Sequence, residues 1–200
     1  MCGRFFVPED HLPPEIEALF REVSKNSEKP ALGEVRPGQK ALVLARNRSR
    51  SECRPFLMKW GFRAGSRMII NARSESAMEK EMFQDLMLER RCLIPFTSYF
   101  EWDHRIKPHA KMRIWPENLN AAMLAGIYRM ENGESCFTVL TRSASDSISH
   151  LHDRMPVILP FEARNDWLAL SLEDPAGYLQ KHWLSDMSYV SMERQISFLS

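Results

Sequence analysis

The sequence predicts an α+β fold built as a single domain over residues 1–200. Many short runs of β-branched and aromatic residues are separated by turn residues, and only a few stretches show helical periodicity. These strands and helices do not alternate regularly, which argues against a doubly wound parallel sheet. No internal repeat or low-complexity linker divides the chain, and 200 residues suffice for one sizeable core.

The first third of the chain predicts three strands and one helix. The strands are expected at residues 2–7, 41–45 and 53–62, with a basic turn between the last two. The helix opens at Pro13-Pro14, and its apolar residues recur at helical spacing: Ile16, Leu19, Phe20 and Val23. Residues 24–38 are polar and contain several Pro and Gly, so they predict a loop.

The remainder predicts more strands and three helices. Ser76 and Glu79 form a capping-box pattern, and the helix they begin would bury Met78, Met82, Leu86 and Leu88. Further helices are expected at residues 161–170 and 175–183, the latter with Asp174 as N-cap. The expected strands are 68–70, 91–95, 97–102, 111–115, 122–129, 136–141, 157–159 and 188–198, with a turn at Asn132-Gly133.

Bulk composition indicates a globular protein without a membrane span. The chain is 44% hydrophobic and 26% charged, and no window approaches eighteen apolar residues. No signal peptide is recognisable, so we expect a cytoplasmic, intracellular protein with reduced thiols. The four cysteines are far apart and have no zinc-site spacing, so neither a metal nor a cofactor is expected. The default oligomeric state is a monomer.

The net charge of +1 conceals a strongly segregated charge. Residues 36–73 contain ten basic residues and a single acid, whereas the rest of the chain has 17 basic and 25 acidic residues. Trp60, Phe62 and Phe56 are interleaved with these cations, and aromatic rings beside Arg are what exposed bases stack on. The segment is therefore either a polyanion-binding surface or a set of solvated residues that fold to different faces.

The start of the chain carries an unusual pair of nucleophiles. Met1 is removable when the next residue is small, and removal would give Cys2 a free α-amine beside its thiol. Such an amine titrates at about 7.7–8.0, so part of it is uncharged at neutral pH. An aldehyde is the target that suits both groups, because the amine forms an imine and the thiol closes a thiazolidine. The alternative is that a small residue at position 2 serves only Met removal.

Three further positions carry residue types used in reactive sites. Asn71 follows an apolar run and is either a cap residue or a binding group. Glu101 lies between Phe100 and Trp102 in a predicted strand, so it faces away from both rings. If that face lines a cleft, its carboxyl is suited to proton transfer. His152 is either a hydrogen-bonded core histidine or a proton carrier.

An arginine stands two residues beyond three of these positions. Arg4 follows Cys2, Arg73 follows Asn71, and Arg154 follows His152. Residues i and i+2 share a face of an extended backbone. The offset therefore predicts a phosphate-binding guanidinium beside each candidate reactive residue.

Several short motifs recur together in an order that resembles a known family. They are Met1-Cys2-Gly3-Arg4-Phe5, Trp60-Gly61-Phe62, Ile70-Asn71-Ala72-Arg73-Ser74-Glu75, Arg91-Cys92-Leu93-Ile94-Pro95, Tyr99-Phe100-Glu101-Trp102 and His152-Asp153-Arg154-Met155-Pro156. The set resembles the SRAP family, the SOS-response-associated peptidase fold of abasic-site-crosslinking proteins. The resemblance spans residues 2 to about 160, and it implies mixed β-sheets that form a barrel-like core flanked by helices.

The resemblance implies a role for each matching residue. Cys2 would form the covalent adduct with a ring-opened abasic sugar in single-stranded DNA, with Asn71 holding the amine and sugar, and Glu101 serving as acid and base. His152 would transfer protons at the sugar and in β-elimination or reversal, an AP-lyase activity. The residues implied to contact DNA are Arg4, Arg73 and Arg154 at phosphates, and Trp60 and Phe62 as a wedge at a single-strand to double-strand junction. Family members are also thought to remove their own Met1.

One stretch departs from the family pattern. Many members carry an Asn-x-Ala-Pro motif before the second strand, but residues 33–38 here read Gly33-Glu34-Val35-Arg36-Pro37-Gly38, with an acid in place of the Asn.

The sequence leaves two alternatives to abasic-site capture open. One is a cysteine peptidase that acts on peptides in trans through Cys2 and His152, and the other is a non-catalytic single-strand DNA-binding module.

Overall fold

The computed structural model describes residues 2–23, 28–46, 52–105, 109–117 and 121–192. Its strands are β1 (Arg4–Val7), β2 (Gly33–Val35), β3 (Lys40–Arg46), β4 (Cys53–Trp60), β5 (Phe62–Ala64), β6 (Arg67–Ile69), β7 (Asn71–Arg73), β8 (Arg91–Phe96), β9 (Ser98–Asp103), β10 (Ala110–Pro116), β11 (Ala122–Glu131), β12 (Glu134–Ser143), β13 (Arg154–Pro156), β14 (Ile158–Pro160) and β15 (Met187–Ser191). The helices are α1 (Pro14–Val23), α2 (Glu81–Glu89), α3 (Arg164–Trp167) and α4 (Pro175–Lys181), with the short 3₁₀ helices η1 (Ser74–Glu79) and η2 (Phe161–Ala163).

Five strands close into a barrel. Strand β12 pairs with β4, β4 with β3, β3 with β8, β8 with β11, and β11 returns to β12. The β12–β4 pairing is parallel and the others are antiparallel, so the sheet is mixed. Strands β7 and β13 extend the sheet from β12, and β14 extends it from β11. The predicted α+β fold with a barrel-like core is therefore confirmed.

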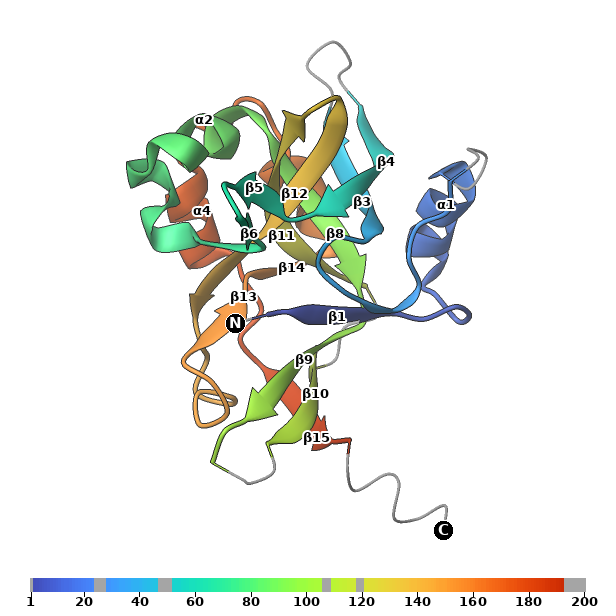
Figure 1. Cartoon of the computed structure of the whole chain (residues 1–200), viewed down its shortest axis with the longest axis vertical. Helices are drawn as coiled ribbons and strands as arrows, with labels where there is room; N and C mark the ends of the chain where they lie inside the picture. Colours follow the sequence, from blue (N-terminus) through green and yellow to red (C-terminus); the bar gives the residue numbers. More distant parts are fainter. Residues whose placement is uncertain (1, 24–27, 47–51, 106–108, 118–120, 193–200) are drawn as a thin grey trace.

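A second sheet places the start of the chain in the middle of the molecule. Its order is β15-β10-β9-β1-β2, so β1 pairs with a neighbour on each side. Figure 1 shows β1 crossing between the barrel and the β9–β10 hairpin. The Phe5 ring on β1 lies 5.0 Å from the Trp60 ring on β4, which joins the core of this sheet to the barrel.

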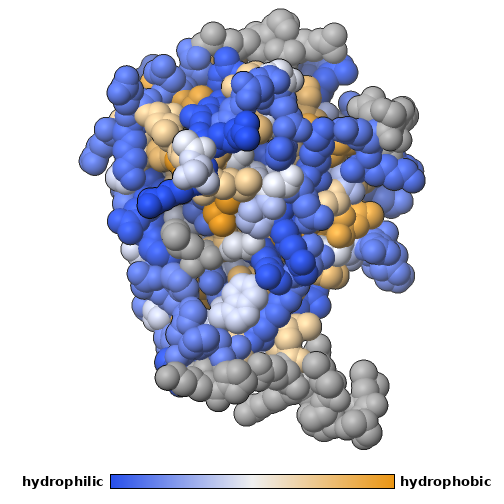
Figure 2. All heavy atoms as spheres, in the orientation of Figure 1, coloured by the Kyte–Doolittle hydropathy of each residue, from blue (hydrophilic) through white to orange (hydrophobic). Residues whose placement is uncertain are grey.

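The helices cover two sides of the barrel. Helix α1 buries Ile16, Phe20 and Val23, the predicted apolar stripe, on one side, and α2 and α4 lie on the opposite side (Figure 1). Asp174 caps α4 as predicted, because its Oδ1 accepts a hydrogen bond from Gly177 N at 2.8 Å. Figure 2 shows that this face of the molecule is mainly hydrophilic, with apolar side chains in small patches. Within the described ranges, we find no helix long and apolar enough to cross a membrane.

The helix after Asn71 begins later than predicted and buries a different face. Ser76 and Glu79 lie inside η1, and Lys80 has an extended backbone with φ −101 and ψ 119 that separates η1 from α2. This break changes the rotational phase of the helix. Phe83, Leu86 and Met87 are therefore buried, whereas Met82 is 43% exposed.

Other boundaries differ where the local signal was weak. Gly61 has a φ of +111, a left-handed conformation that favours glycine, and it divides the expected strand at residues 53–62 into β4 and β5. The expected loop contains β2, a strand that exists only because β1 provides a partner. The expected helix at residues 161–170 is shortened to η2 and α3. The final strand ends at Ser191, and residues 193–198 of the expected strand lie outside the described residues.

The side chain of Arg91 links the end of α2 to the end of α3 and the residues that follow α3. It is only 4% exposed, and its guanidinium donates to the carbonyls of Met87 and Leu88 at 2.5 and 2.6 Å. It also donates to the carbonyls of Trp167 and Ala169 at 2.7 and 2.5 Å. Burial lowers its pKa to about 10, so the guanidinium stays charged at neutral pH and four carbonyls share that charge.

We expect Arg91→Met to lower the free energy of unfolding by about 2–4 kcal/mol, because it keeps the apolar stem but leaves several buried carbonyls without donors. Urea denaturation followed by circular dichroism measures this. The matched control is Arg21→Ala on α1, whose side chain is 71% exposed. The control should change stability by less than about 0.5 kcal/mol. An Arg91 variant as stable as the control would show that these contacts contribute nothing.

Candidate functional site

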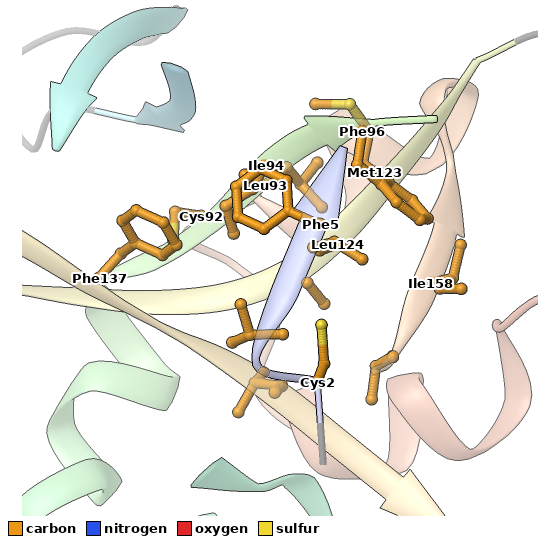
Figure 3. Close-up of a cluster of buried hydrophobic side chains, with 14 of the residues drawn as sticks. Cys2, Phe5, Cys92, Leu93, Ile94, Phe96, Met123, Leu124, Phe137 and Ile158 are labelled. Carbon is orange, nitrogen blue, oxygen red and sulfur yellow. The ribbon is translucent and has the colours of Figure 1, made fainter. Parts of the chain in front are cut away.

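Cys2 lies in the core rather than at the surface. Its exposed fraction is 0%, and Figure 3 shows its sulfur pointing into the cluster of buried apolar side chains that includes Phe5, Leu124 and Ile158. The Sγ atom lies 3.8 Å from the carbonyl oxygen of Arg4. The start of the chain is therefore held at a fixed place, as expected for a residue that precedes a central strand.

Asn71 holds the backbone of Cys2. Its Nδ2 donates to the carbonyl oxygen of Cys2 at 2.9 Å, across 69 residues of sequence. Its Oδ1 is buried and accepts no hydrogen bond from any described residue. Asn71 also lines a cavity of about 440 Å³ together with Arg73 and Thr141. Because buried polar groups are normally paired, this oxygen has the capacity to accept one further hydrogen bond.

Glu101 and Tyr99 face Cys2 from β9. The alternation of β9 puts both on one side, where they are 4% and 0% exposed, and puts Phe100 and Trp102 on the other, as predicted. Burial, and then the negative charge of Glu101, raise the pKa of the Cys2 thiol well above its ordinary value. The thiol is therefore protonated at neutral pH.

Tyr99 is a site residue that the sequence reasoning missed. Burial, followed by the charges of Cys2 and Glu101, raises the pKa of Tyr99 well above its usual value. That hydroxyl has no hydrogen-bond partner among the described residues. The available signal was its position two residues before Glu101 in a strand, which puts both side chains on one face.

Arg154 is linked to the strand that carries Asn71 through the side chain of Thr141. Arg154 forms an ion pair with Glu75, with Nη1 to Oε1 at 2.5 Å, and donates to Thr141 Oγ1 at 3.3 Å. Thr141 in turn donates to the carbonyl of Ala72 at 3.3 Å. His152 Nδ1 accepts from the backbone N–H of Arg154 at 2.9 Å, and it lies 2.7 Å from Asp153 Oδ1. Arg154, two residues after His152, is thereby linked to β7 through Thr141.

Arg4 lies on the opposite side of β1 from the core, so the expected pairing of Cys2 and Arg4 on one face is wrong. Cys2 precedes the first residue of β1, and strand alternation does not extend to it. The Arg4 guanidinium lies 5.0 Å from the centre of the Trp102 ring and pairs with Glu34, Nη1 to Oε1 at 2.5 Å. In β7, Asn71, Ala72 and Arg73 all line one cavity.

The expected aromatic wedge of Trp60 and Phe62 is wrong. Both side chains are 0% exposed. Trp60 donates from Nε1 to the carbonyl of Ile70 at 2.9 Å and stacks on Phe137 at 6.2 Å. Phe62 packs 6.5 Å from Phe83. These rings fill the core, because aromatic residues interleaved with cations along a strand point inward when the cations point out.

The basic segment does not form one continuous cationic surface. Lys40 and Lys59 both lie 3.3 Å from Glu134, which comes from the acidic remainder of the chain. Arg36 lies 3.4 Å from Glu34, and Arg54 lies 3.2 Å from Glu52. Arg48 and Arg50 lie outside the described residues. The charges of the segment are thus distributed over several elements and partly neutralised there.

Comparison with known proteins identifies the family. The family model described as SOS response associated peptidase (SRAP) matches residues 1–197. The chain belongs to the SRAP family. The match to the family model therefore extends beyond the residues that carry recognisable motifs, into the C-terminal region.

Relatives within the SRAP family are similar along most of their length. The abasic site processing protein YoqW of Bacillus subtilis is 32% identical over 197 residues, which cover 90% of this chain and 85% of YoqW. YobE of the same organism is 35% identical over 161 residues, 73% of this chain and 71% of YobE. YedK of Escherichia coli is 28% identical over 178 residues, covering 84% of this chain and 79% of YedK.

Solved structures share the SRAP fold seen here. A crystal structure of a protein from Bacteroides thetaiotaomicron matches 100% of this chain and 95% of its own, with a TM-score of 0.74 at 21% identity. A phage-related protein from Bordetella bronchiseptica matches 96% and 94%, with a TM-score of 0.73 at 20% identity. At this identity the likeness concerns the fold.

We expect Cys53 to react first with iodoacetamide in the native protein, because it is the free cysteine that is not buried. Cys2, Cys92 and Cys136 should react at least about tenfold more slowly, since they require local opening. Mass spectrometry of digested samples over time measures this. In Cys53→Ser the fast phase should disappear. Labelling of Cys2 as fast as Cys53 would contradict its burial.

Proposed function

We propose that this protein processes abasic sites in single-stranded DNA by covalent capture through Cys2. The observation that carries the proposal is the hydrogen bond from Asn71 Nδ2 to the Cys2 carbonyl. Asn71 therefore links the backbone of Cys2 to the wall of the cavity that Asn71 lines with Arg73 and Thr141. The side chain of Glu101, the proposed acid and base, is also buried. Relatives that cover most of the chain are named abasic site processing proteins, which supports the same substrate.

The capture requires the free amine of Cys2, and therefore removal of Met1. The amine adds to the aldehyde of the ring-opened sugar and loses water to form an imine. The thiol sulfur then bonds to the imine carbon, and the thiol proton ends on the nitrogen of the resulting thiazolidine. Because the two nucleophiles are on adjacent carbons, the second step is intramolecular and needs no exposed thiol.

The raised pKa of the Cys2 thiol makes a neighbouring base necessary. A thiol that is protonated at neutral pH must lose its proton as it attacks, and Glu101 supplies the nearby carboxylate. The same carboxyl assists the ring opening that exposes the aldehyde. The buried hydroxyl of Tyr99 supplies a neutral donor for a sugar oxygen.

The remaining residues bind and position the DNA. Asn71 Oδ1 accepts from the sugar or the amine, and His152 carries protons at the sugar and in the β-elimination that an imine permits. Arg73 and Arg154 hold phosphates that flank the lesion, and Arg4 holds another from the outer face of β1. Recognition needs no base reading, since the lesion has no base, so binding should be sequence-independent and weaken as salt rises.

A thiol peptidase that acts in trans is less well supported. Such an enzyme needs an accessible thiolate, but Cys2 is fully buried and burial keeps its thiol protonated. A non-catalytic DNA-binding module would not require Asn71 to hold the start of the chain. Experiment can distinguish covalent capture from both alternatives, because only covalent capture depends on Cys2 and on DNA together.

We expect Cys2→Ala to abolish a denaturant-stable adduct with an oligonucleotide that carries one abasic site, because the variant lacks the sulfur that closes the ring. Denaturing gel electrophoresis measures the adduct after removal of uracil by a glycosylase. The control Cys53→Ala should crosslink like the wild type. Intact mass of the protein reports whether Met1 is absent. If Cys2→Ala gives the stable adduct at the wild-type level, the proposed mechanism is wrong.

We expect Glu101→Gln to slow crosslinking by about 10²–10⁴-fold, because it removes the base while keeping the size of the side chain. Single-turnover crosslinking measures the rate, and fluorescence anisotropy on undamaged DNA measures binding. Binding should stay within about twofold of the wild type, since Glu101 is only 4% exposed. An unchanged crosslinking rate would remove Glu101 from the mechanism.

A further inference from the structure

Three cations converge on one carboxylate on the outer face of the second sheet. Glu34 on β2 pairs with Arg4 at 2.5 Å and with Arg36 at 3.4 Å, and it accepts a hydrogen bond from Lys111 on β10. Burial alone would raise its pKa, but the hydrogen bonds from Lys111 and Arg4 lower the pKa of Glu34 below its ordinary value. The carboxylate is therefore ionised at neutral pH, and the cluster has a net charge of +2.

Two of these cations, Lys111 and Arg4, also lie over aromatic rings of this face. Lys111 Nζ lies 4.1 Å from the centre of the Phe100 ring, and Arg4 lies 5.0 Å from that of Trp102. These contacts keep the positive groups in place whether or not Glu34 occupies them. Arg36, at 61% exposed, keeps one side of the cluster open to solvent, whereas Glu34 is only 19% exposed.

A carboxylate and a phosphodiester are alternative ligands for such a cluster. Both present two oxygens that accept charge-assisted hydrogen bonds from guanidinium and ammonium groups. We propose that Glu34 occupies a phosphodiester-binding subsite formed by Arg4, Lys111 and Arg36, from which a phosphate of single-stranded DNA displaces it. Arg4 is two residues from Cys2 but lies on the outer face of β1, so the subsite would receive a phosphate of the strand beyond the lesion. The identity of the ligand as DNA rests on the proposed function.

The proposal predicts whether Glu34 strengthens or weakens the binding of DNA. DNA that enters the subsite must break the contacts of Glu34 and then lies close to a negative charge. Glu34 therefore weakens binding, although it pairs with cations in the free protein. Removing its charge while keeping its shape should strengthen binding, which is the reverse of what loss of a supporting contact would do.

The test measures binding of undamaged single-stranded DNA by fluorescence anisotropy over a series of salt concentrations. Glu34→Gln should lower the Kd by about three- to tenfold at low salt and steepen the dependence of log K on log salt by up to about one. Glu17→Gln is the matched control, since it removes one carboxylate from an exposed pair with Arg21 on α1. The control changes net charge equally, and it should leave the Kd within about twofold of the wild type.

Lys111→Gln provides an independent test on the same subsite. It should weaken binding and reduce the salt slope by about one, because one phosphate contact is lost. Unchanged or weaker binding by a folded Glu34→Gln protein, or unchanged binding by Lys111→Gln, would overturn the proposal. An equal gain in Glu17→Gln would also overturn it, since the effect would then come from net charge.

The outcome separates this proposal from abasic-site capture. Binding to undamaged DNA involves no covalent step, so it reports on the subsite alone. A Cys2-dependent adduct with no effect of Glu34→Gln would remove the subsite and leave the capture mechanism intact. Tighter binding by Glu34→Gln without any adduct would support the subsite while removing the capture mechanism.

Discussion

The hydrogen bond between Asn71 and the Cys2 carbonyl is the contact on which the candidate site depends. It is possible only because β1 lies in the interior of the second sheet, paired with β9 on one side and β2 on the other. A chain terminus is usually mobile, and fixing its backbone costs conformational entropy of about 1–2 kcal/mol per residue. Burial of Cys2 and Phe5 in the core offsets that cost, so the fold itself positions the start of the chain.

Burial gives the Cys2 thiol two opposite properties. Desolvation and the charge of Glu101 keep it protonated, which makes it a poor nucleophile toward reagents from solution. In the proposed capture, the same carboxylate takes up the thiol proton once an electrophile is attached to the adjacent amine. Under that proposal the site is unreactive until its substrate arrives, since reactivity requires the amine, the thiol and the base to act on one bound carbon.

Sequence patterns predicted the α+β fold and most strand positions, because strand alternation is a local property, and the resemblance to the SRAP family implied the barrel-like core. They failed where the outcome depends on distant partners. The burial of Trp60 and Phe62 depends on which face meets the core, and β2 forms only against β1. The helix after η1 changed its buried face because Lys80 is extended. Tyr99 was overlooked because an aromatic strand residue looks like core until Cys2 is placed beside it.

Charge segregation along the sequence is likewise a weak guide to surface potential, because acids from distant strands decide which cations remain available. Glu134 engages Lys40 and Lys59 on the barrel, Glu75 engages Arg154 in the site, and Glu34 engages Arg4 on the outer sheet. Among the described residues of the basic segment, Arg36, Lys40, Arg54 and Lys59 are each paired with an acid, so their charges are partly neutralised. A polyanion that binds such a surface must match the remaining positive positions geometrically or displace a carboxylate.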